Sequence, residues 1–142
     1  MNEGTHPSSG VTVDQINAFL KEAFTDDAST CQEVGDRWAI ARFTPSESSL
    51  RPGGIISGQN VFGVCDRALY YACFTVIGIE PMVLKSELSI RFMRPARGET
   101  VRARAVLNNA GRRSLVGTVT AWTDDPERPV AVAQGTYVTP QR

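Results

Sequence analysis

The sequence predicts an α+β fold in which an antiparallel β-sheet of five or six strands wraps around one long buried helix. Residues 58–77 contain no proline and carry apolar side chains on every side, which is typical of a buried helix. From residue 84 onward apolar and polar residues alternate, as they do in a strand with one covered face. Short turns separate the later strands, which favours antiparallel pairing and a helix layer against a sheet layer.

Length and charge limit the class of protein. A chain of 142 residues with 42% hydrophobic content is expected to form a single domain, here residues 12–142, after a flexible polar tail over 1–11. Fifteen basic residues balance fifteen acidic ones, so we expect no nucleic-acid partner and no attraction to an anionic membrane. The sequence has no apolar run of the roughly 20 residues that span a bilayer, which favours a cytoplasmic location.

The first third of the chain predicts one short helix and one strand. Apolar residues at helical spacing follow Thr12 or Asp14, either of which can serve as the N-cap, and the helix is expected to end near Phe24. Alternation then predicts a strand over 36–43. A long polar loop is expected over 44–51.

The central helix is expected over residues 58–77. Gly78 supplies the usual stop signal, and Pro81 prevents the helix from continuing. A helix of this length extends about 30 Å and would cross a small domain from end to end.

Four strands are expected after the helix. They are predicted at about residues 84–92, 101–107, 113–123 and 130–139. The turns between them are predicted at 94–98, 108–111 and 124–129. In the first of these strands one face is expected to carry Leu84, Leu88, Ile90 and Phe92. The other face is expected to carry Lys85, Glu87, Ser89 and Arg91.

The segment LRPGGIISGQNVFGVCDRALYYA (residues 50–72), together with IRFMRPARGETVRARA (residues 90–105), resembles the hot-dog thioesterases of the phenylacetate-pathway and 4-hydroxybenzoyl-CoA type. In that family a loop of the form N-x-x-G-x-[VI]-H-G-G enters the central helix, and an Asp or Glu follows seven residues after its last glycine. The matching loop positions here are Arg51, Gly54, Ile56, Ser57, Gly58 and Gln59. Asp66 matches the acidic position.

The resemblance implies an acyl-CoA thioesterase that works as a homodimer or a dimer of dimers, without a cofactor. Three positions depart from the family pattern: Arg51 replaces Asn, Ser57 replaces His and Gln59 replaces the second Gly. These departures leave the predicted fold unchanged. They also favour an alternative function, in which a hot-dog protein binds acyl-CoA or another small ligand without turning it over.

Asp66 is the best candidate catalytic residue. It is the one acidic residue of the predicted buried helix, and a carboxylate in such a place is costly unless it has partners or a task. It could activate or position the water that attacks a thioester. The structural alternative is an ion pair with Arg67 or another arginine, or a hydrogen bond to a backbone amide.

The start of the helix predicts the groups that polarise the thioester carbonyl. The backbone amides of Gly58 and Gln59 lack helical acceptors, and the helix dipole favours negative charge near them. Ser57 is interpreted as the N-cap in preference to a substrate contact, while Gln59 and Asn60 could orient water or substrate or be ordinary first-turn polar residues.

Spacing along the helix indicates a site shared between two chains. Asp66 lies eight residues beyond Gly58, or about 12 Å along the axis. One helix therefore cannot bring both groups to one carbonyl. Two antiparallel helices, one from each subunit, could do so.

Arginines are the candidates for binding the substrate. Arg51 lies in the loop before the helix. The side chains that could hold the phosphates of coenzyme A are Arg91, Arg94, Arg97, Arg112 and Arg113. Arg112 and Arg113 are preferred because they lie in a turn, and the alternative for all of them is a solvated sheet face.

Other chemistries have weaker support in the sequence. The one histidine, His6, falls in the predicted tail, so neither a Ser-His-Asp arrangement nor the core histidine of a hot-dog hydratase or dehydratase is expected. No clustered ligands indicate a metal site. The three cysteines, Cys31, Cys65 and Cys73, are interpreted as reduced and structural.

Overall fold

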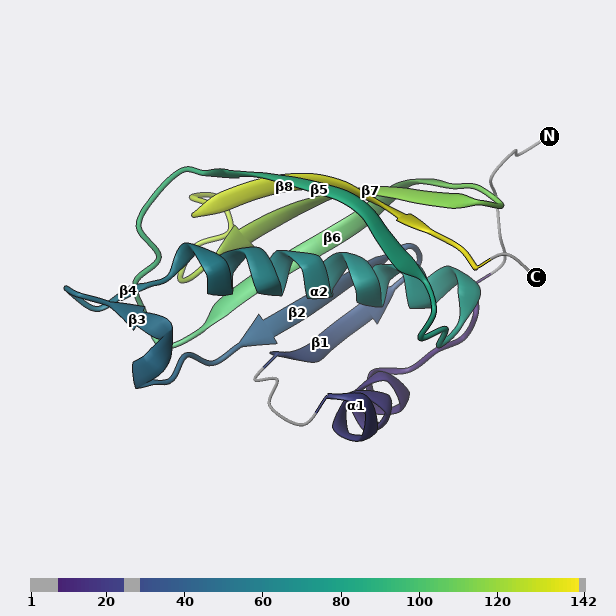
Figure 1. Ribbon diagram of the computed structural model, residues 1–142, viewed down its shortest axis with the longest axis horizontal. Coiled ribbons are helices and arrows are strands. Elements are labelled where there is room, and N and C mark those ends of the chain that lie inside the picture. The colour runs from purple at the N-terminus through teal and green to yellow at the C-terminus, as the bar shows by residue number, and fades with distance from the viewer. Residues whose placement is uncertain (1–7, 25–28, 141–142) are drawn as a thin grey trace.

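The computed structural model describes residues 8–24 and 29–140, and it consists of a curved sheet folded around one helix (Figure 1). Two helices are present in this part of the chain, α1 (Val13–Ala23) and α2 (Gly58–Ile77). The strands of the main sheet are β1 (Ser29–Gly35), β2 (Trp38–Phe43), β5 (Leu84–Phe92), β6 (Val101–Ala110), β7 (Ser114–Trp122) and β8 (Ala131–Val138). A 3-10 turn, η1 (Glu47–Ser49), leads into a small ribbon of β3 (Leu50–Arg51) and β4 (Ile55–Ile56).

The main sheet has the order β1-β2-β6-β7-β8-β5, and every pair of neighbours is antiparallel. The predicted α+β fold, an antiparallel sheet around a long central helix, is confirmed. Alternating residues of β6, β7 and β8 are buried, so one face of the sheet covers α2 and the other faces outward. Of the helices described, neither is long and apolar enough to cross a membrane.

Helix α2 begins and ends at the predicted residues. Each end is set by a specific residue. Ser57 caps its first turn, and Gly78 ends it with a φ of 78°, a conformation that glycine adopts without strain. Most of the helix is buried. Gln59, Phe62 and Asp66 remain at least partly exposed at helical spacing, so α2 keeps one open side.

A pair of facing glycines lets α2 lie close to the sheet. Gly117 of β7 is paired with Gly135 of β8, and both lie under the side chain of Leu69. A Cβ atom added to Gly117 would stand 2.6 Å from Leu69 Cδ1 and 2.8 Å from the carbonyl oxygen of Val106. The glycine pair therefore forms a notch in which Leu69 sits.

A β-bulge in β5 changes which side chains face the helix. Lys85 pairs with Tyr137, whereas the next regular pair is Glu87 with Thr136, so Ser86 is an extra residue. The prediction that Leu84 shares a face with Leu88, Ile90 and Phe92, and Lys85 the opposite face, is therefore wrong. Because a one-residue shift exchanges the two faces, Leu84 is turned outward and is 64% exposed, while Lys85 is turned toward α2.

Two strand predictions also need correction. Strand β1 was not anticipated, because its sequence STCQEVG is mostly polar and its alternation is interrupted by a register shift after Cys31. The strand predicted over 36–43 begins at Trp38, since Asp36 and Arg37 form the turn from β1 and Arg37 has a φ of 65°. The strand thus begins two residues later than predicted.

Two predicted loops contain more structure than expected. Strand β6 runs through the turn predicted at 108–111 as far as Ala110, because a second register shift after Leu107 absorbs one residue. The loop predicted over 44–51 contains η1 and β3. This loop supports the start of α2.

Within its described part, the predicted tail is bonded to α2 through Ser9. The amide of Ser9 donates a hydrogen bond to the carbonyl oxygen of Thr75 at 2.8 Å, and its hydroxyl donates to that of Phe74 at 2.5 Å. Hydrogen bonds between the predicted tail and the domain thus begin before residue 12. His6, for which an inert role was predicted, lies outside the described residues.

Candidate active site

The first turn of α2 is held by a small polar network. The Asn60 amide N–H donates to the Ser57 hydroxyl at 3.3 Å, and the Asn60 side-chain nitrogen donates to the same oxygen at 2.6 Å. The amide of Ser57 donates to the carbonyl oxygen of Ser49 at 2.9 Å. The interpretation of Ser57 as the N-cap is confirmed, and Asn60 ties the cap to the helix.

The amides of Gly58 and Gln59 remain available at this end of the helix. Among the described residues neither of these N–H groups has a hydrogen-bond acceptor, as expected for the first positions of a helix. A pocket of about 520 Å³ opens beside Gly58. The pocket is also lined by Arg51, Arg94 and the half-exposed ring of Phe92.

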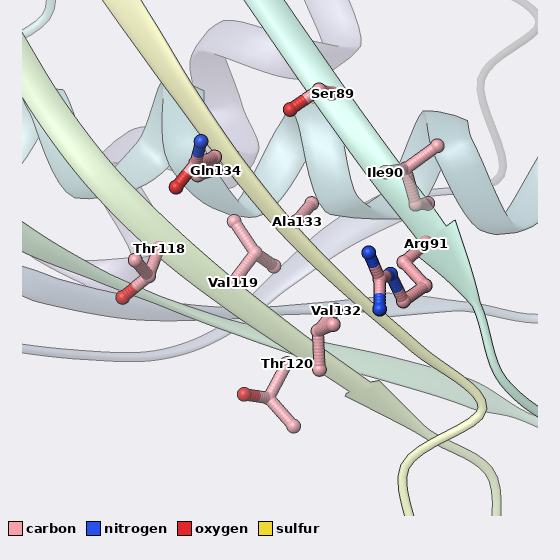
Figure 2. A pocket seen from close by; sticks show the side chains of 9 residues that line it. All are labelled: Ser89, Ile90, Arg91, Thr118, Val119, Thr120, Val132, Ala133 and Gln134. Atoms are coloured by element: carbon pink, nitrogen blue, oxygen red, sulfur yellow. The ribbon is translucent and has the colours of Figure 1, made fainter.

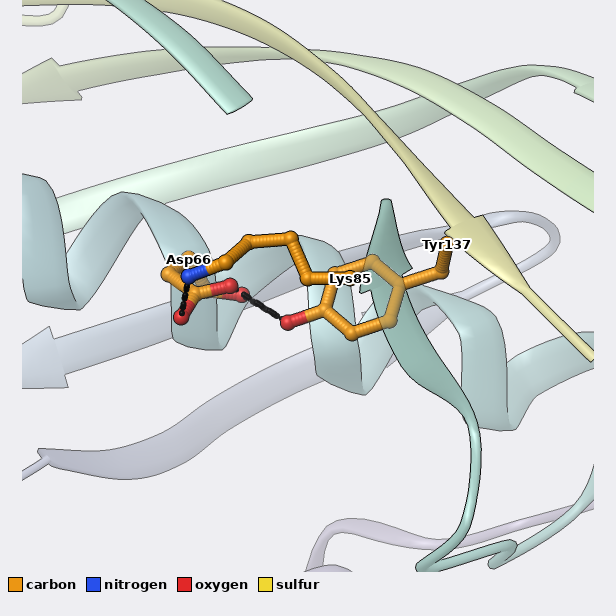
Figure 3. A network of polar contacts seen from close by, with 3 residues as sticks. All are labelled: Asp66, Lys85 and Tyr137. Carbon is orange, nitrogen blue, oxygen red and sulfur yellow. Dashed lines mark hydrogen bonds and ion pairs between the residues drawn. The ribbon is translucent and has the colours of Figure 1, made fainter. Parts of the chain in front are cut away.

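Asp66 projects from α2 and is held by two strands (Figure 3). Lys85 Nζ of β5 lies 3.0 Å from Asp66 Oδ2, and the phenol of Tyr137 in β8 donates a hydrogen bond to Asp66 Oδ1. The predicted structural alternative paired Asp66 with Arg67, another arginine or a backbone amide. The Arg67 guanidinium instead lies 3.8 Å above the centre of the Phe24 ring.

The Asp66 carboxylate is accessible although it is bonded. Its side chain is 24% exposed and lines a pocket of about 210 Å³. The other walls of this pocket include Tyr70, Val83 and Tyr137. A carboxylate oxygen can accept more than one hydrogen bond, so a water molecule in this pocket could still bind to Asp66.

The other titratable side chains around Asp66 stay protonated at neutral pH. Burial, followed by the charge of Asp66, raises the pKa of Tyr137 well above its usual range. Burial also raises the pKa of the Cys65 thiol to about 12 and that of Cys73 further. Because a thiol must ionise to become a strong nucleophile, these buried cysteines are structural, as predicted, and Asp66 is the basic group of the pocket.

The predicted substrate-binding arginines lie in three places. Arg51 and Arg94 line the pocket beside Gly58, where Arg94 also donates to the Pro129 carbonyl oxygen at 2.7 Å. Arg91 lies on the outer face of the sheet, in a depression formed by β5, β7 and β8 (Figure 2). Arg112 and Arg113 lie in the β6–β7 turn, at the end of the molecule where α2 terminates (Figure 1).

One chain does not bring the two halves of the predicted site together. Gly58 and Asp66 line separate pockets, as their eight-residue spacing on one straight helix requires. One pocket therefore contains Gly58 and the other contains Asp66.

Lys85 and Tyr137 are site residues that the sequence did not reveal. Lys85 was predicted on the wrong face of β5 because the bulge at Ser86 was not recognised. Tyr137 lies 71 residues from Asp66 along the chain, and alternation in β8 gave only its burial. The one signal in the sequence is a basic residue in the alternating strand that follows the helix with the acidic residue.

Comparison with known proteins identifies the family. The model of the thioesterase superfamily matches residues 53–130, which is more than half of the chain. The chain belongs to the thioesterase superfamily. Its fold is accordingly the hot-dog fold that the sequence predicted.

Individual relatives agree with this membership. A provisionally named esterase of Saccharolobus solfataricus is 28% identical over 130 residues, which cover 90% of this chain and 85% of that protein. The crystal structure of a provisionally named thioesterase from Silicibacter sp. TM1040 is 26% identical with a TM-score of 0.80, and the match covers 96% of this chain and all of that one.

A more distant structure supports the fold. The PaaI protein of the Escherichia coli phenylacetic acid degradation operon is 21% identical with a TM-score of 0.70, and the match covers 87% of this chain and 89% of that one. Thioester hydrolysis is the general activity that the family supports for this thioesterase-superfamily chain.

Proposed function

We propose that this protein hydrolyses an acyl-CoA thioester to the free acid and coenzyme A, with Asp66 as the group that activates or positions water. The observation that carries the proposal is the Asp66 carboxylate, which is paired with Lys85, bonded to Tyr137 and still accessible from a pocket. A general base must be able to accept a proton and must lie within reach of water, and a carboxylate that opens into a pocket suits both requirements.

The second half of the site is proposed to come from another copy of the chain. Thioester hydrolysis builds negative charge on the carbonyl oxygen, and the amides of Gly58 and Gln59 are donors that could stabilise it. If the open sides of two α2 helices face each other in opposite directions, these amides of one subunit lie near Asp66 of the other. The functional unit is then a homodimer, which could assemble further into a dimer of dimers.

The same arrangement gathers the arginines that are separated within one chain. Arg112 and Arg113 lie where α2 ends, and Arg51 and Arg94 lie where it begins. Antiparallel helices would place the first pair from one subunit near the second pair from its partner. Such a cluster suits the phosphates of coenzyme A, because arginine forms charge-assisted, bidentate hydrogen bonds with phosphate.

The proposed reaction is a single hydrolysis. Water loses a proton toward Asp66 while its oxygen bonds to the carbonyl carbon, and the amides hold the resulting oxyanion. The C–S bond then breaks, and the coenzyme A sulfur leaves as a thiolate that takes up a proton. The acyl group departs as a carboxylate, so the step requires no cofactor.

Asp66→Asn tests this proposal directly. Asn preserves the size of the side chain but cannot act as a base, so kcat should fall by about 10²- to 10⁴-fold. The assay is release of coenzyme A from benzoyl-CoA, phenylacetyl-CoA, hexanoyl-CoA and octanoyl-CoA, measured together with the melting temperature and light scattering. A dimeric, equally stable variant with wild-type turnover would exclude the catalytic role.

The same assays separate an enzyme from a binding protein. Tight binding of these thioesters by the wild-type protein, without release of coenzyme A from any of them, would favour the ligand-binding alternative. A loss of dimer or of thermal stability in Asp66→Asn, with turnover per dimer unchanged, would make Asp66 a structural ion-pair partner.

A further inference from the structure

We propose that Lys85 and Tyr137 are positioning residues for the reaction: they fix the plane of the Asp66 carboxylate and keep one side of it directed into the pocket for water. This inference rests on the function proposed for Asp66. It assigns to β5 and β8 a part in catalysis that the residues of α2 alone do not supply.

The two contacts restrain the one torsion that Asp66 could otherwise change. The terminal torsion of an aspartate is broad, so a carboxylate held at one oxygen can still rotate. Here Lys85 contacts Oδ2 at 3.0 Å and Tyr137 donates to Oδ1, so each oxygen has its own partner (Figure 3). The partners come from different strands, which fixes the orientation of the carboxylate relative to the sheet.

Both partners complement the oxygens of a carboxylate. Lys85 contributes a positive charge, and Tyr137 contributes a hydrogen-bond donor that is 5% exposed. The raised pKa of Tyr137 keeps its proton in place at working pH, so it remains a donor rather than a competing base. Each carboxylate oxygen retains capacity to accept a hydrogen bond from water.

The register of the sheet brings the two residues to the same place. Lys85 and Tyr137 are a cross-strand pair, and the bulge at Ser86 is what turns Lys85 toward α2. A regular strand would point the side chain at position 85 outward, away from Asp66. Bulges often redirect a side chain beside an active site, and this one places a cation beside the proposed base.

The experiment compares Lys85→Met and Tyr137→Phe with the wild-type dimer on whichever of the four thioesters named above is turned over fastest. We expect kcat to fall by about 10- to 100-fold, with KM changing less than about threefold, because orientation is lost and binding is not.

Three control variants isolate positioning from general effects of substitution. Lys85→Arg keeps the cation and should leave kcat within about threefold of wild type. Lys21→Met removes the exposed lysine of α1, and Tyr71→Phe removes the hydroxyl of a buried tyrosine of α2. Neither of these two should lower kcat.

Each outcome decides the inference. In the Asp66→Asn background, Lys85→Met and Tyr137→Phe should lower kcat no further, because both act through Asp66. If Asp66→Asn is inactive but the two variants keep wild-type kcat, the inference is wrong and the proposed function stands. A lower melting temperature with kcat per dimer unchanged would also overturn it. Wild-type turnover in Asp66→Asn would overturn both.

Discussion

Ser57 and Gly58 show how two adjacent residues prepare one end of α2 for chemistry. The Ser57 hydroxyl accepts hydrogen bonds from the backbone amide and the side chain of Asn60. The cap therefore satisfies the third amide of the helix and leaves the first two amides free. Gly58 brings no side chain between these amides and the adjoining pocket. The backbone, rather than the side chain of Gln59, is therefore the proposed donor.

Gly58→Pro should abolish most turnover, whereas Gly58→Ala should retain it. Proline is well tolerated at the first helical position, and Ser57 already has the extended conformation, φ −63° and ψ 149°, that a residue before proline prefers. Proline removes the N–H donor, which should lower kcat by about 10²- to 10³-fold. Alanine keeps the donor and places its Cβ in ordinary contact with Phe92, at 3.4 Å. Equal coenzyme A release by the two variants would contradict the role of this amide.

The sequence predicts the site residues that depend on their neighbours in the chain, and it does not predict those that make long-range contacts. Ser57 and Gly58 were identified because capping depends on neighbours in sequence, and Asp66 because a lone acid stands out in an apolar helix. Lys85 and Tyr137 reach Asp66 across separations of 19 and 71 residues. Such contacts depend on strand register, which alternation alone does not determine.

At the level of elements, the Gly117–Gly135 pair sets the distance between the sheet and α2. Leu69 fills the space that two side chains would otherwise occupy. A Cβ at position 117 would also stand 2.8 Å from the backbone carbonyl oxygen of Val106, in the neighbouring strand β6. Because this carbonyl belongs to the sheet ladder, it cannot move aside as the end of a flexible side chain could.

Gly117→Ala should therefore destabilise the protein by about 1–3 kcal/mol through overpacking. Urea unfolding followed by circular dichroism measures the free energy of unfolding. Thr118→Ala, at the exposed neighbouring position, is the control and should change that free energy by less than about 0.5 kcal/mol. An unchanged free energy of unfolding for Gly117→Ala would show that the sheet can move to accommodate the added methyl group.

Elements with a strong period were predicted well, and elements with interruptions were not. The apolar run and terminal glycine located α2 at its observed bounds, and alternation located β5, β7 and β8 within one or two residues. Strand β1 is polar, and register shifts interrupt both β1 and β5. A bulge adds one residue without a marked change in composition. Alternation therefore assigns the residues on one side of the bulge to the wrong face of the strand.

At the level of the whole molecule, the separation of Gly58 from Asp66 makes the proposed site a property of two chains. An antiparallel pair of α2 helices has two-fold symmetry, so each dimer would contain two equivalent sites. Each site takes its base from one subunit and its amides from the other. Defects in the two halves are therefore expected to complement each other.

Mixing Asp66→Asn and Gly58→Pro subunits should restore activity that neither variant shows alone. After unfolding and joint refolding at equal concentrations, random pairing would leave about a quarter of the sites with both intact halves. Coenzyme A release by the mixture should therefore approach a quarter of the wild-type rate. A mixture as inactive as its components, with hybrid dimers verified by native mass spectrometry, would place the whole site within one chain.

The bulge in β5 affects how relatives align with this chain. Ser86 is the residue in excess, because the pairs on either side of it, Lys85 with Tyr137 and Glu87 with Thr136, use consecutive residues of β8. A relative without the extra residue would show a one-residue gap at Ser86, within β5, and its residue aligned with Lys85 would still face the acidic helix residue. Deletion of Ser86 should accordingly leave Lys85 beside Asp66, whereas a relative of equal length with a regular strand would turn the residue aligned with Lys85 outward.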